Sequence, residues 1–297
     1  MKRLLTGSAG RIGRAIHAAA IGQHSVRGLD RSPFSTTTLI GDVAAPELLK
    51  RALDGVDAVI HTASLHAPHV GLVAEAEFQR VNVQGVQTLV ALARQAGVQR
   101  IVYTSTTALY GAAVDGRQCH GIDEGVPPQP TTIYHRSKLA AEQVLVAEAD
   151  ACLQVRVVRM SRCFPEPVDR MALYRLHRGI DVCDVADAHL AALAADGAHF
   201  QCCIASGHTP FQSEDLAGLW DAPQAVLARR CPSLLAEFSA RGWPLPARID
   251  RVYDASAAWR QWGWRSRHGY REVLDQAGRR SLEVLPWLPG FADRTTE

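Results

Sequence analysis

The sequence predicts an α/β protein built on a doubly wound parallel sheet, and three observations lead to this class. Short apolar runs alternate with helical patterns over the first 160 residues. The run at 57–61 is continuously apolar at its centre, as in strands that parallel sheets bury on both faces. A glycine-rich segment at 6–13 follows the first run and precedes the first helical pattern.

Each expected strand and helix is predicted by its own sequence pattern. The expected strands are the apolar runs at 3–5, 25–30, 57–61, 100–105 and 155–159. The expected helices, which carry apolar residues at helical spacing, lie at 14–20, 46–53, 75–95 and 132–149. Pro46 stands in the first turn of its helix and Gly55 just past the end, which are favourable positions for these residues, and Gly97 ends the helix at 75–95.

The pattern weakens after Phe164. Prolines interrupt this half at positions 165, 167, 210, 223, 232, 244 and 246. We therefore expect residues 1–163 to form the sheet domain, and residues 164–297 to form a smaller, more irregular region interleaved with it that covers the substrate.

Composition excludes several classes of protein. The 297 residues are 47% hydrophobic and 21% charged, which is typical of a globular protein. The net charge of +2 gives no sign of a basic surface that would bind nucleic acid or an anionic membrane. No run of 18 apolar residues predicts a membrane span. Seven cysteines without a CxxC pair favour reduced thiols in the cytoplasm, and twelve histidines without ligand spacing predict no metal site.

The segment from Thr6 to Gly13 has the composition of a phosphate-binding loop. Gly7 permits a tight turn, Gly10 lets the backbone approach a pyrophosphate, and Gly13 lets the helix pack closely on the sheet. The phosphates would meet the free N–H groups and the positive dipole end of the helix. The spacing is GxxGxxG rather than GxGxxG, and an ordinary turn between strand and helix is the alternative.

Asp30 ends the second predicted strand, 17 residues after Gly13. A carboxylate there can accept hydrogen bonds from the adenosine ribose and would repel a 2′-phosphate, so it predicts NAD rather than NADP. The alternative is a turn aspartate ahead of Ser32 and Pro33.

The pair Tyr134 and Lys138 carries the most specific chemistry. Residues four apart share one face of a helix, and an ammonium beside a phenol favours the phenolate and lowers the phenol pKa. Such a tyrosine can pass a proton to or from a substrate oxygen near neutral pH. With three lysines among 297 residues, the pair is rare by chance.

These motifs, in this order, resemble the extended short-chain dehydrogenase/reductase family, also called the NAD-dependent epimerase/dehydratase family, which has a Rossmann-type fold. The resemblance covers residues 1–160 and continues more loosely to about 275. Besides the glycine loop and the YxxxK pair, similar stretches lie at 42–43, 61–64, 82–85, 103–111, 181–186 and 262–265. The implied cofactor contacts come from Gly7, Gly10, Arg11, Ile12, Gly13, Asp30, Asp42, Val43, His61, Ala63, Ser64, Asn82, Tyr134 and Lys138.

The resemblance also implies a separate role for each of three site residues. Tyr134 would be the general acid/base, Lys138 would lower its pKa and hold the nicotinamide ribose, and Thr106 would bond the substrate hydroxyl or carbonyl. Family members commonly form homodimers through two long helices, here 75–96 and 132–149, so a homodimer is expected.

The substrate side departs from members that act on nucleotide sugars. Arg162 replaces an asparagine, and about twenty residues separate Phe164 from Asp184, which leaves little chain to enclose a nucleotide diphosphate. Residues 161–167 followed by Arg170 are instead similar to a stretch of uronate dehydrogenases, in which an arginine binds the substrate carboxylate. Arg170 is therefore a candidate substrate contact, with a solvated helix start as the alternative. His66, which follows the stretch at 61–64, and Thr107, next to Thr106, are further candidates, and a position in a surface loop is the alternative for His66.

We expect an NAD-dependent oxidoreductase that acts on a hydroxyl or carbonyl of a small polar substrate that could derive from a sugar. A nucleotide-sugar epimerase or dehydratase is the second interpretation. The third is an NAD(P)-sensing binding protein without turnover.

Overall fold

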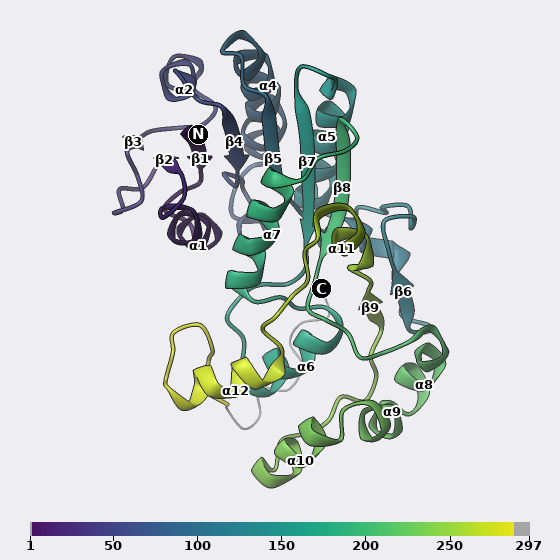
Figure 1. Ribbon diagram of the computed structural model, residues 1–297. Helices are drawn as coiled ribbons and strands as arrows, with labels where there is room; N and C mark the ends of the chain where they lie inside the picture. Colours follow the sequence, from purple (N-terminus) through teal and green to yellow (C-terminus); the bar gives the residue numbers. More distant parts are fainter. Residues whose placement is uncertain (1, 288–297) are drawn as a thin grey trace.

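A seven-stranded sheet forms the centre of the computed structural model, which describes residues 2–287 (Figure 1). Its strands lie in the order β3-β2-β1-β4-β5-β7-β8, and their pairings are parallel. The bounds are β1 Lys2–Thr6, β2 Ser25–Asp30, β3 Leu39–Ile40, β4 Ala58–His61, β5 Arg100–Thr106, β7 Gln154–Met160 and β8 Phe200–Ala205. The predicted α/β class with a doubly wound parallel sheet is confirmed.

Helices cover both faces of the sheet. One face carries α1 (Arg11–Ala20), α7 (Val182–Ala194) and α11 (Ser256–Trp262), and the other carries α2 (Pro46–Leu53), α4 (Gly85–Gln95) and α5 (Ile133–Glu148). Successive strand residues point to opposite faces, so Leu4 packs in the core beneath α2, α4 and α5, whereas Leu5 packs beneath α1 and α7. Within residues 2–287, no helix combines the length and apolar character needed to cross a bilayer.

A smaller lobe lies beyond the carboxyl ends of the strands, in the lower part of Figure 1. Its helices are α6 (Val168–His177), α8 (Leu216–Asp221), α9 (Pro223–Arg230), α10 (Pro232–Arg241) and α12 (Tyr270–Gly278). Met171, Leu219, Phe238 and Val273 belong to its own apolar core. Beside it, β6 (His120–Ile122) pairs in parallel with β9 (Arg251–Tyr253).

The second half of the chain contributes to both parts. β8 extends the main sheet by pairing with β7, and α7 packs against α1. The sequence pattern missed β8 because this edge strand carries Gln201 and Cys202 among its apolar residues. It also missed the helices of this half, because Pro223 and Pro232 begin α9 and α10 instead of interrupting them.

The helix expected at 75–95 is divided. The chain forms α3 (Glu75–Phe78), a π-helical segment at Gln79–Gln84, and then α4. A π-helical turn holds more residues than an α-helical one, so it changes the direction of the side chains within it. Asn82 lies in this segment and is buried.

The topology fixes where a ligand can bind. β1 lies between β2 and β4, so the order of the strands reverses there and leaves a crevice at the carboxyl ends of the strands. Thr6, His61 and Thr106, which end β1, β4 and β5, lie at this edge. The edge faces the smaller lobe.

Candidate active site

The loop between β1 and α1 turns so tightly that two glycines have no room for a side chain. Gly7 has φ of 71°, and a Cβ there would lie 2.5 Å from the Thr62 hydroxyl oxygen. A Cβ on Gly13 would collide with the Gly7 carbonyl oxygen. The first turn of α1 therefore packs directly against the end of β1.

Gly10 has the opposite environment. Within 4 Å of a Cβ built on Gly10 lies one atom, the Gly7 carbonyl oxygen at 3.3 Å, so its outer face is open. Arg11, Ile12 and Gly13 follow in the first turn of α1, where backbone N–H groups lack acceptors within the helix. An anion at this point would meet those N–H groups, so the loop fits the pyrophosphate of a dinucleotide.

Asp30 lies beside the glycine loop at the end of β2. Its carboxylate accepts hydrogen bonds from the backbone N–H groups of Ala9 at 3.0 Å and Ser32 at 2.9 Å. This is the position from which a carboxylate can bond the ribose of a bound dinucleotide. Further along this edge, Asp42 accepts a hydrogen bond from Arg80 at 2.6 Å, and Val43 is buried.

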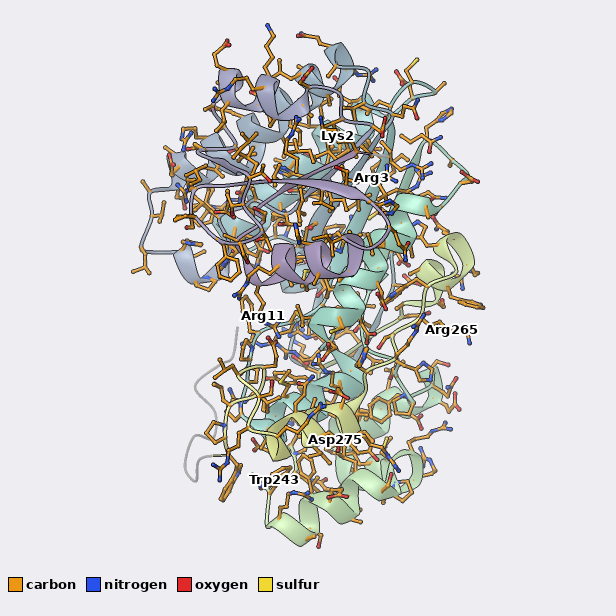
Figure 2. The ribbon with its side chains drawn as sticks, turned by 60° about the vertical axis from the view of Figure 1, so that its left-hand side comes forward. Lys2, Arg3, Arg11, Trp243, Arg265 and Asp275 are labelled. Atoms are coloured by element: carbon orange, nitrogen blue, oxygen red, sulfur yellow. The ribbon has the colours of Figure 1, made fainter. Side chains whose placement is uncertain are left out.

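The Arg11 side chain joins the loop to the second half of the chain. Figure 2 shows Arg11 at the junction between α1 and the smaller lobe. Its guanidinium donates to the Cys163 carbonyl and forms an ion pair with Glu283. A cofactor contact from Arg11 therefore stays a prediction, and the backbone N–H is the group that faces the loop's phosphate position.

His61, at the carboxyl end of β4, lies inside the protein. His61 is 1% exposed, and its Nδ1 lies 2.8 Å from the Thr6 hydroxyl oxygen. Burial, with the charge of Lys138, lowers the pKa of His61 to about 3, so the ring is neutral. The partly exposed Ala63 and Ser64 follow it, so they, rather than the His61 ring, can line a cofactor here.

Asn82 connects the chain just after β4 to α5. Its side-chain amide bonds both backbone groups of Leu65 and the hydroxyl of Ser137, which lies on α5. The side chain is 1% exposed. Its role in the structure is thus to position α5, and a direct cofactor contact from Asn82 stays a prediction.

Thr106 and Tyr134 meet at the carboxyl end of β5. Thr132 caps α5 by accepting the His135 N–H at 3.2 Å, which places Tyr134 in the first turn. Burial raises the pKa of Tyr134 to about 12, and the neighbouring Thr106 side chain opposes this rise.

Lys138 lies one helical turn after Tyr134 and is 2% exposed. Its Nζ donates to the Thr104 carbonyl at 2.6 Å and lies 4.0 Å from the centroid of the Tyr103 ring. Burial lowers the pKa of Lys138 to about 7, and the charge of Glu142 opposes this. Burial dominates the pKa of the phenol and the ammonium is held against β5, so the role of Lys138 in lowering the pKa of Tyr134 stays a prediction.

The candidate substrate contacts lie in different surroundings. The His66 ring is 6.1 Å from the Phe164 ring, and burial lowers the pKa of His66. Thr107 is buried at 4% exposure, whereas Arg170 on α6 forms an ion pair with Glu166 at 3.7 Å. The structure thus brings His66 to the segment that follows β7, and substrate binding by these three residues stays a prediction.

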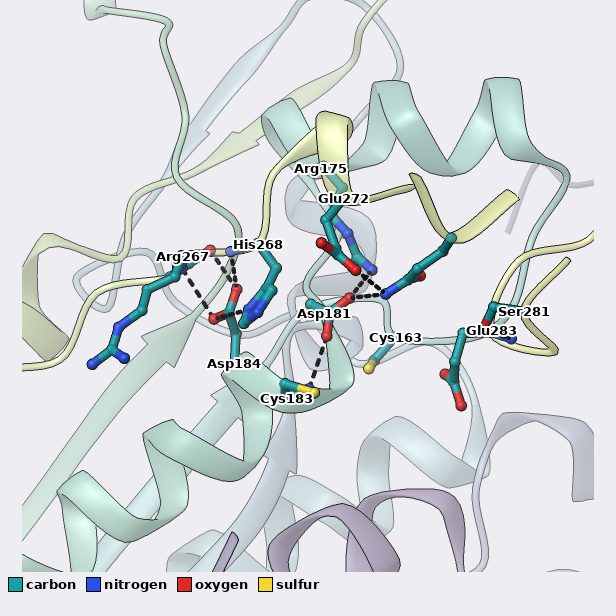
Figure 3. A network of polar contacts seen from close by, with 12 residues as sticks. Cys163, Arg175, Asp181, Cys183, Asp184, Arg267, His268, Glu272, Ser281 and Glu283 are labelled. Atoms are coloured by element: carbon teal, nitrogen blue, oxygen red, sulfur yellow. Dashed lines mark hydrogen bonds and ion pairs between the residues drawn. The ribbon is translucent and has the colours of Figure 1, made fainter. Parts of the chain in front are cut away.

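Two aspartates at the start of α7 hold the smaller lobe on the sheet (Figure 3). Asp181 accepts a hydrogen bond from Arg175 at 2.8 Å, and both side chains are 2% exposed. Asp184 accepts hydrogen bonds from the Ser266 hydroxyl and from both the backbone and the ring of His268. These contacts fix the position of α6 and of the chain before α12 relative to the sheet.

Sequence reasoning missed a buried carboxylate, Glu142, behind the candidate site. It follows Lys138 by four residues on α5 and forms an ion pair with Arg159 at 2.7 Å. The spacing of four after Lys138 was the signal that could have identified it. In the part of the chain that the structure describes, no group of three or more His, Cys, Asp or Glu side chains could hold a metal ion.

Comparison with known proteins gives both a family match and several relatives. Residues 3–170 match the model of the NAD dependent epimerase/dehydratase family. The chain is 34% identical over 145 residues to N-acetyl-alpha-D-glucosaminyl-diphospho-ditrans,octacis-undecaprenol 4-epimerase of Escherichia coli O157:H7, covering 48% of this chain and 42% of the relative. It is 32% identical over 153 residues to UDP-glucose 4-epimerase of Azospirillum brasilense, covering 48% and 43%. The matched region spans less than half the length of these relatives.

Solved structures match over nearly the whole chain. MoeE5 in complex with UDP-glucuronic acid and NAD has a TM-score of 0.69 and 25% identity, covering 95% of this chain and 100% of that chain. The enzyme WbmG of Bordetella bronchiseptica in complex with NAD has a TM-score of 0.65 and 21% identity, covering 94% and 93%. The second likeness supports the fold alone.

Proposed function

Because the chain belongs to the NAD-dependent epimerase/dehydratase family, we propose that it is an NAD-dependent oxidoreductase acting at a hydroxyl or carbonyl carbon of a small polar substrate derived from a sugar. The observation that carries this proposal is the juxtaposition of the Thr106 and Tyr134 side chains at the carboxyl end of β5, with Lys138 one turn further along α5. All three lie at the sheet edge that also carries the glycine loop.

Residues of the crevice would hold the cofactor. Gly7, Gly10 and Gly13 leave room for a pyrophosphate at the start of α1, and Asp30 lies where it can bond the adenosine ribose. Lys138 would hold the nicotinamide ribose, and Ala63 and Ser64 would line the pocket at the end of β4. NAD, when bound, supplies the exchange of hydride with the substrate carbon.

The protein's own part is the handling of a proton. With a pKa of about 12, Tyr134 is a neutral phenol at neutral pH and can donate a proton to a substrate oxygen. In the oxidation direction Tyr134 must accept that proton, and nearby positive charge, which Lys138 supplies, favours the phenolate. Thr106, beside Tyr134, would orient the same substrate oxygen.

The substrate would lie between the end of β5 and the segment after β7. His66 lies near Phe164 of that segment, and Arg170, which pairs with Glu166, would turn toward the substrate. An arginine can bind a carboxylate through two parallel hydrogen bonds. A carboxylate-bearing sugar acid is therefore the first class of substrate to test, with Arg170 as its partner.

A nucleotide-sugar epimerase or dehydratase is the second candidate. The likeness to MoeE5 favours it, since that protein is described with UDP-glucuronic acid and NAD and its chain is covered in full. Because that chain is covered in full, this chain has a comparable length available to enclose a nucleotide diphosphate. The expectation from the short segment between Phe164 and Asp184, which points the other way, stays a prediction.

The nucleotide retained by the purified protein separates these candidates. The protein is purified without added nucleotide and denatured, and the released nucleotide is identified by mass spectrometry. An empty protein that binds NAD reversibly supports a dehydrogenase, which must exchange its cofactor every turnover. Near-stoichiometric NAD supports an epimerase or dehydratase, which regenerates it. NADP in the site would contradict the role of Asp30, and a protein that neither retains nor binds either nucleotide would contradict the proposal.

A dimer is a separate proposal. We expect α4 and α5 to pack against their counterparts in a second copy of the chain, and Val146, which is 49% exposed on α5, would lie in that contact. Sedimentation as a monomer at micromolar concentration would contradict it.

A further inference from the structure

A buried carboxylate lies behind the pair of Tyr134 and Lys138. Glu142 is 5% exposed and follows Lys138 by four residues on α5, so the two side chains share the inner face of the helix. One oxygen of Glu142 accepts a hydrogen bond from the Ser105 hydroxyl. Glu142 takes no direct part in the proposed proton transfer, in which it contacts neither substrate nor cofactor.

Arg159 fixes the position of this carboxylate. Ser105 on β5 and Arg159 on β7 are register partners in the sheet. The Arg159 guanidinium donates to Glu142 from Nη2 at 2.7 Å and from Nε at 3.2 Å. Its other nitrogen, Nη1, donates to the Tyr110 hydroxyl at 3.1 Å, so the guanidinium is held between two partners.

Lys138 has little else to stabilise its charge. Its neighbours are the Thr104 carbonyl and the Tyr103 ring on β5, Tyr134 on its own helix, and the neutral His61 and His66 at and after the end of β4. The Tyr103 hydroxyl is buried without a hydrogen-bond partner, and burial, with the charge of Glu142, raises its pKa, so it stays neutral. Among the groups around the ammonium, Glu142 supplies the opposite charge.

We propose that Glu142, held by Ser105 and Arg159, is a positioning residue that favours the ammonium form of the buried Lys138 side chain. The catalytic consequence rests on the function proposed above, because there Lys138 favours the phenolate of Tyr134 and holds the cofactor ribose. The electrostatic relation between Glu142 and Lys138 itself does not depend on any ligand.

Lysine NMR can test this relation directly. The chain contains three lysines, Lys2, Lys50 and Lys138, so ¹³C at the lysine Cε gives three signals, and the variants Lys2→Arg and Lys50→Arg assign them. We expect Glu142→Gln to lower the titration midpoint of Lys138 by about one pH unit, because it removes the charge and keeps the shape. Glu142→Asp keeps the charge and should retain most of the wild-type midpoint.

A second variant keeps the test possible if Glu142→Gln does not fold. Glu142→Gln leaves the Arg159 guanidinium buried without its partner, which can destabilise the fold. The double variant Glu142→Gln/Arg159→Gln removes both charges, and its Lys138 midpoint should also move downward, by less than in Glu142→Gln because loss of the Arg159 charge opposes the shift. A folded Glu142→Gln protein in which Lys138 titrates as in the wild type would overturn the proposal, and so would an unshifted double variant if Glu142→Gln does not fold.

The same samples separate this inference from the proposed function. If NAD fails to bind the wild-type protein while the Lys138 midpoint still moves in Glu142→Gln, the proposed function fails and the present inference stands. If NAD binds and turnover is found, the pH at which kcat falls on the alkaline side should move downward with the midpoint. A role limited to packing would lower kcat without that shift.

Discussion

The side chain of Asn82 donates a hydrogen bond to the Ser137 hydroxyl at 2.9 Å, across 55 positions of sequence. The same amide accepts the Leu65 N–H at 2.8 Å and donates to the Leu65 carbonyl at 2.9 Å. Ser137 in turn donates to the Tyr134 carbonyl at 2.9 Å. One buried amide thus holds the loop after β4 against the helix that carries Tyr134 and Lys138.

Replacing this amide should weaken both the fold and the site. Asn82→Ala removes three buried hydrogen bonds and leaves the two backbone groups of Leu65 without their partner. We expect the free energy of unfolding to fall by about 2–4 kcal/mol. Urea denaturation measures this change. Ser137→Ala, which loses the single bond to Asn82 and its bond to Tyr134, is the matched control and should cost about 1–2 kcal/mol. Equal effects of the two substitutions would contradict the bridging role of Asn82.

The strands and helices of the first half could be predicted because local pattern and burial agree there. The helix 46–53 was predicted to the residue, and β4 differs from its expected range only at Asp57. β3 has two residues and β8 is an edge strand with polar side chains, so neither shows the periodicity that sequence reasoning depends on. The π-helical segment around Asn82 had no sequence signal at all, since its apolar spacing fits an ordinary helix.

Within the site, residue types predicted location better than side-chain direction. The glycines and Asp30 could be placed because tight turns and strand ends have strict requirements. The direction of Arg11 could not, because its partner Glu283 is 272 positions away. Nor could the pKa of Tyr134, since burial, which opposes the effect of a nearby ammonium, is a property of the folded chain.

Tyr134→Phe should abolish turnover and leave the cofactor site intact. The substitution removes the phenol that transfers the proton, and general acid–base groups typically contribute about 10²–10⁴-fold to the rate. We expect kcat to fall by that factor while the Kd for NAD changes by less than about threefold, as measured by steady-state kinetics and calorimetry. Tyr270→Phe, on α12 in the smaller lobe, is the control, because it removes a phenol hydroxyl that bonds Ser233 outside the candidate site. Unchanged activity in Tyr134→Phe would favour a binding protein without turnover.

Asp30→Asn should weaken NAD binding and relax the choice of cofactor. Hydrogen bonds from a ribose to a charged group contribute about 1.5–3 kcal/mol, so the Kd for NAD should rise by about 10-fold or more. Removal of the charge, with Arg31 adjacent, should at the same time improve NADP binding. The ratio of the two Kd values is the measurement, and the exposed Asp221→Asn in the smaller lobe is the control. A ratio that stays at the wild-type value would rule out the ribose contact.

Glu283→Gln should tighten NAD binding at low salt. The ion pair of Glu283 with Arg11 places a negative charge beside the turn where the pyrophosphate would bind. The pair is partly exposed, so we expect a modest effect of about two- to fivefold in Kd that decreases as salt is added. Titrations at two ionic strengths test this, and Arg11→Met should change the Kd in the opposite direction. An effect of Glu283→Gln that is independent of salt would point to a local change of structure instead.

Buried histidines should make the fold sensitive to mild acid. Within residues 2–287, His61, His177 and His189 are at most 6% exposed, and burial lowers their pKa values to about 3, 3 and 4. Below the unfolded value of about 6.5 the unfolded chain binds protons that the folded protein cannot, so stability is complete above that pH and is lost as the pH falls toward the folded pKa values.

The expected loss is large enough to measure. Each histidine contributes about 1.4 kcal/mol over this whole window, because the unfolded ring takes up its proton midway through it, so the free energy of unfolding should fall by about 4 kcal/mol between pH 7.5 and 5.5. His268 opposes this in part: burial lowers its pKa, but the hydrogen bond and charge of Asp184 raise it overall, so it stabilises the fold at lower pH. Urea denaturation at a series of pH values gives the slope, and His189→Gln should reduce it by about a third, whereas the exposed His208→Gln should not. Carboxylates titrate mostly below this window, so a stability that is flat from pH 7.5 to 5.5 would mean that the three rings are protonated in the folded state.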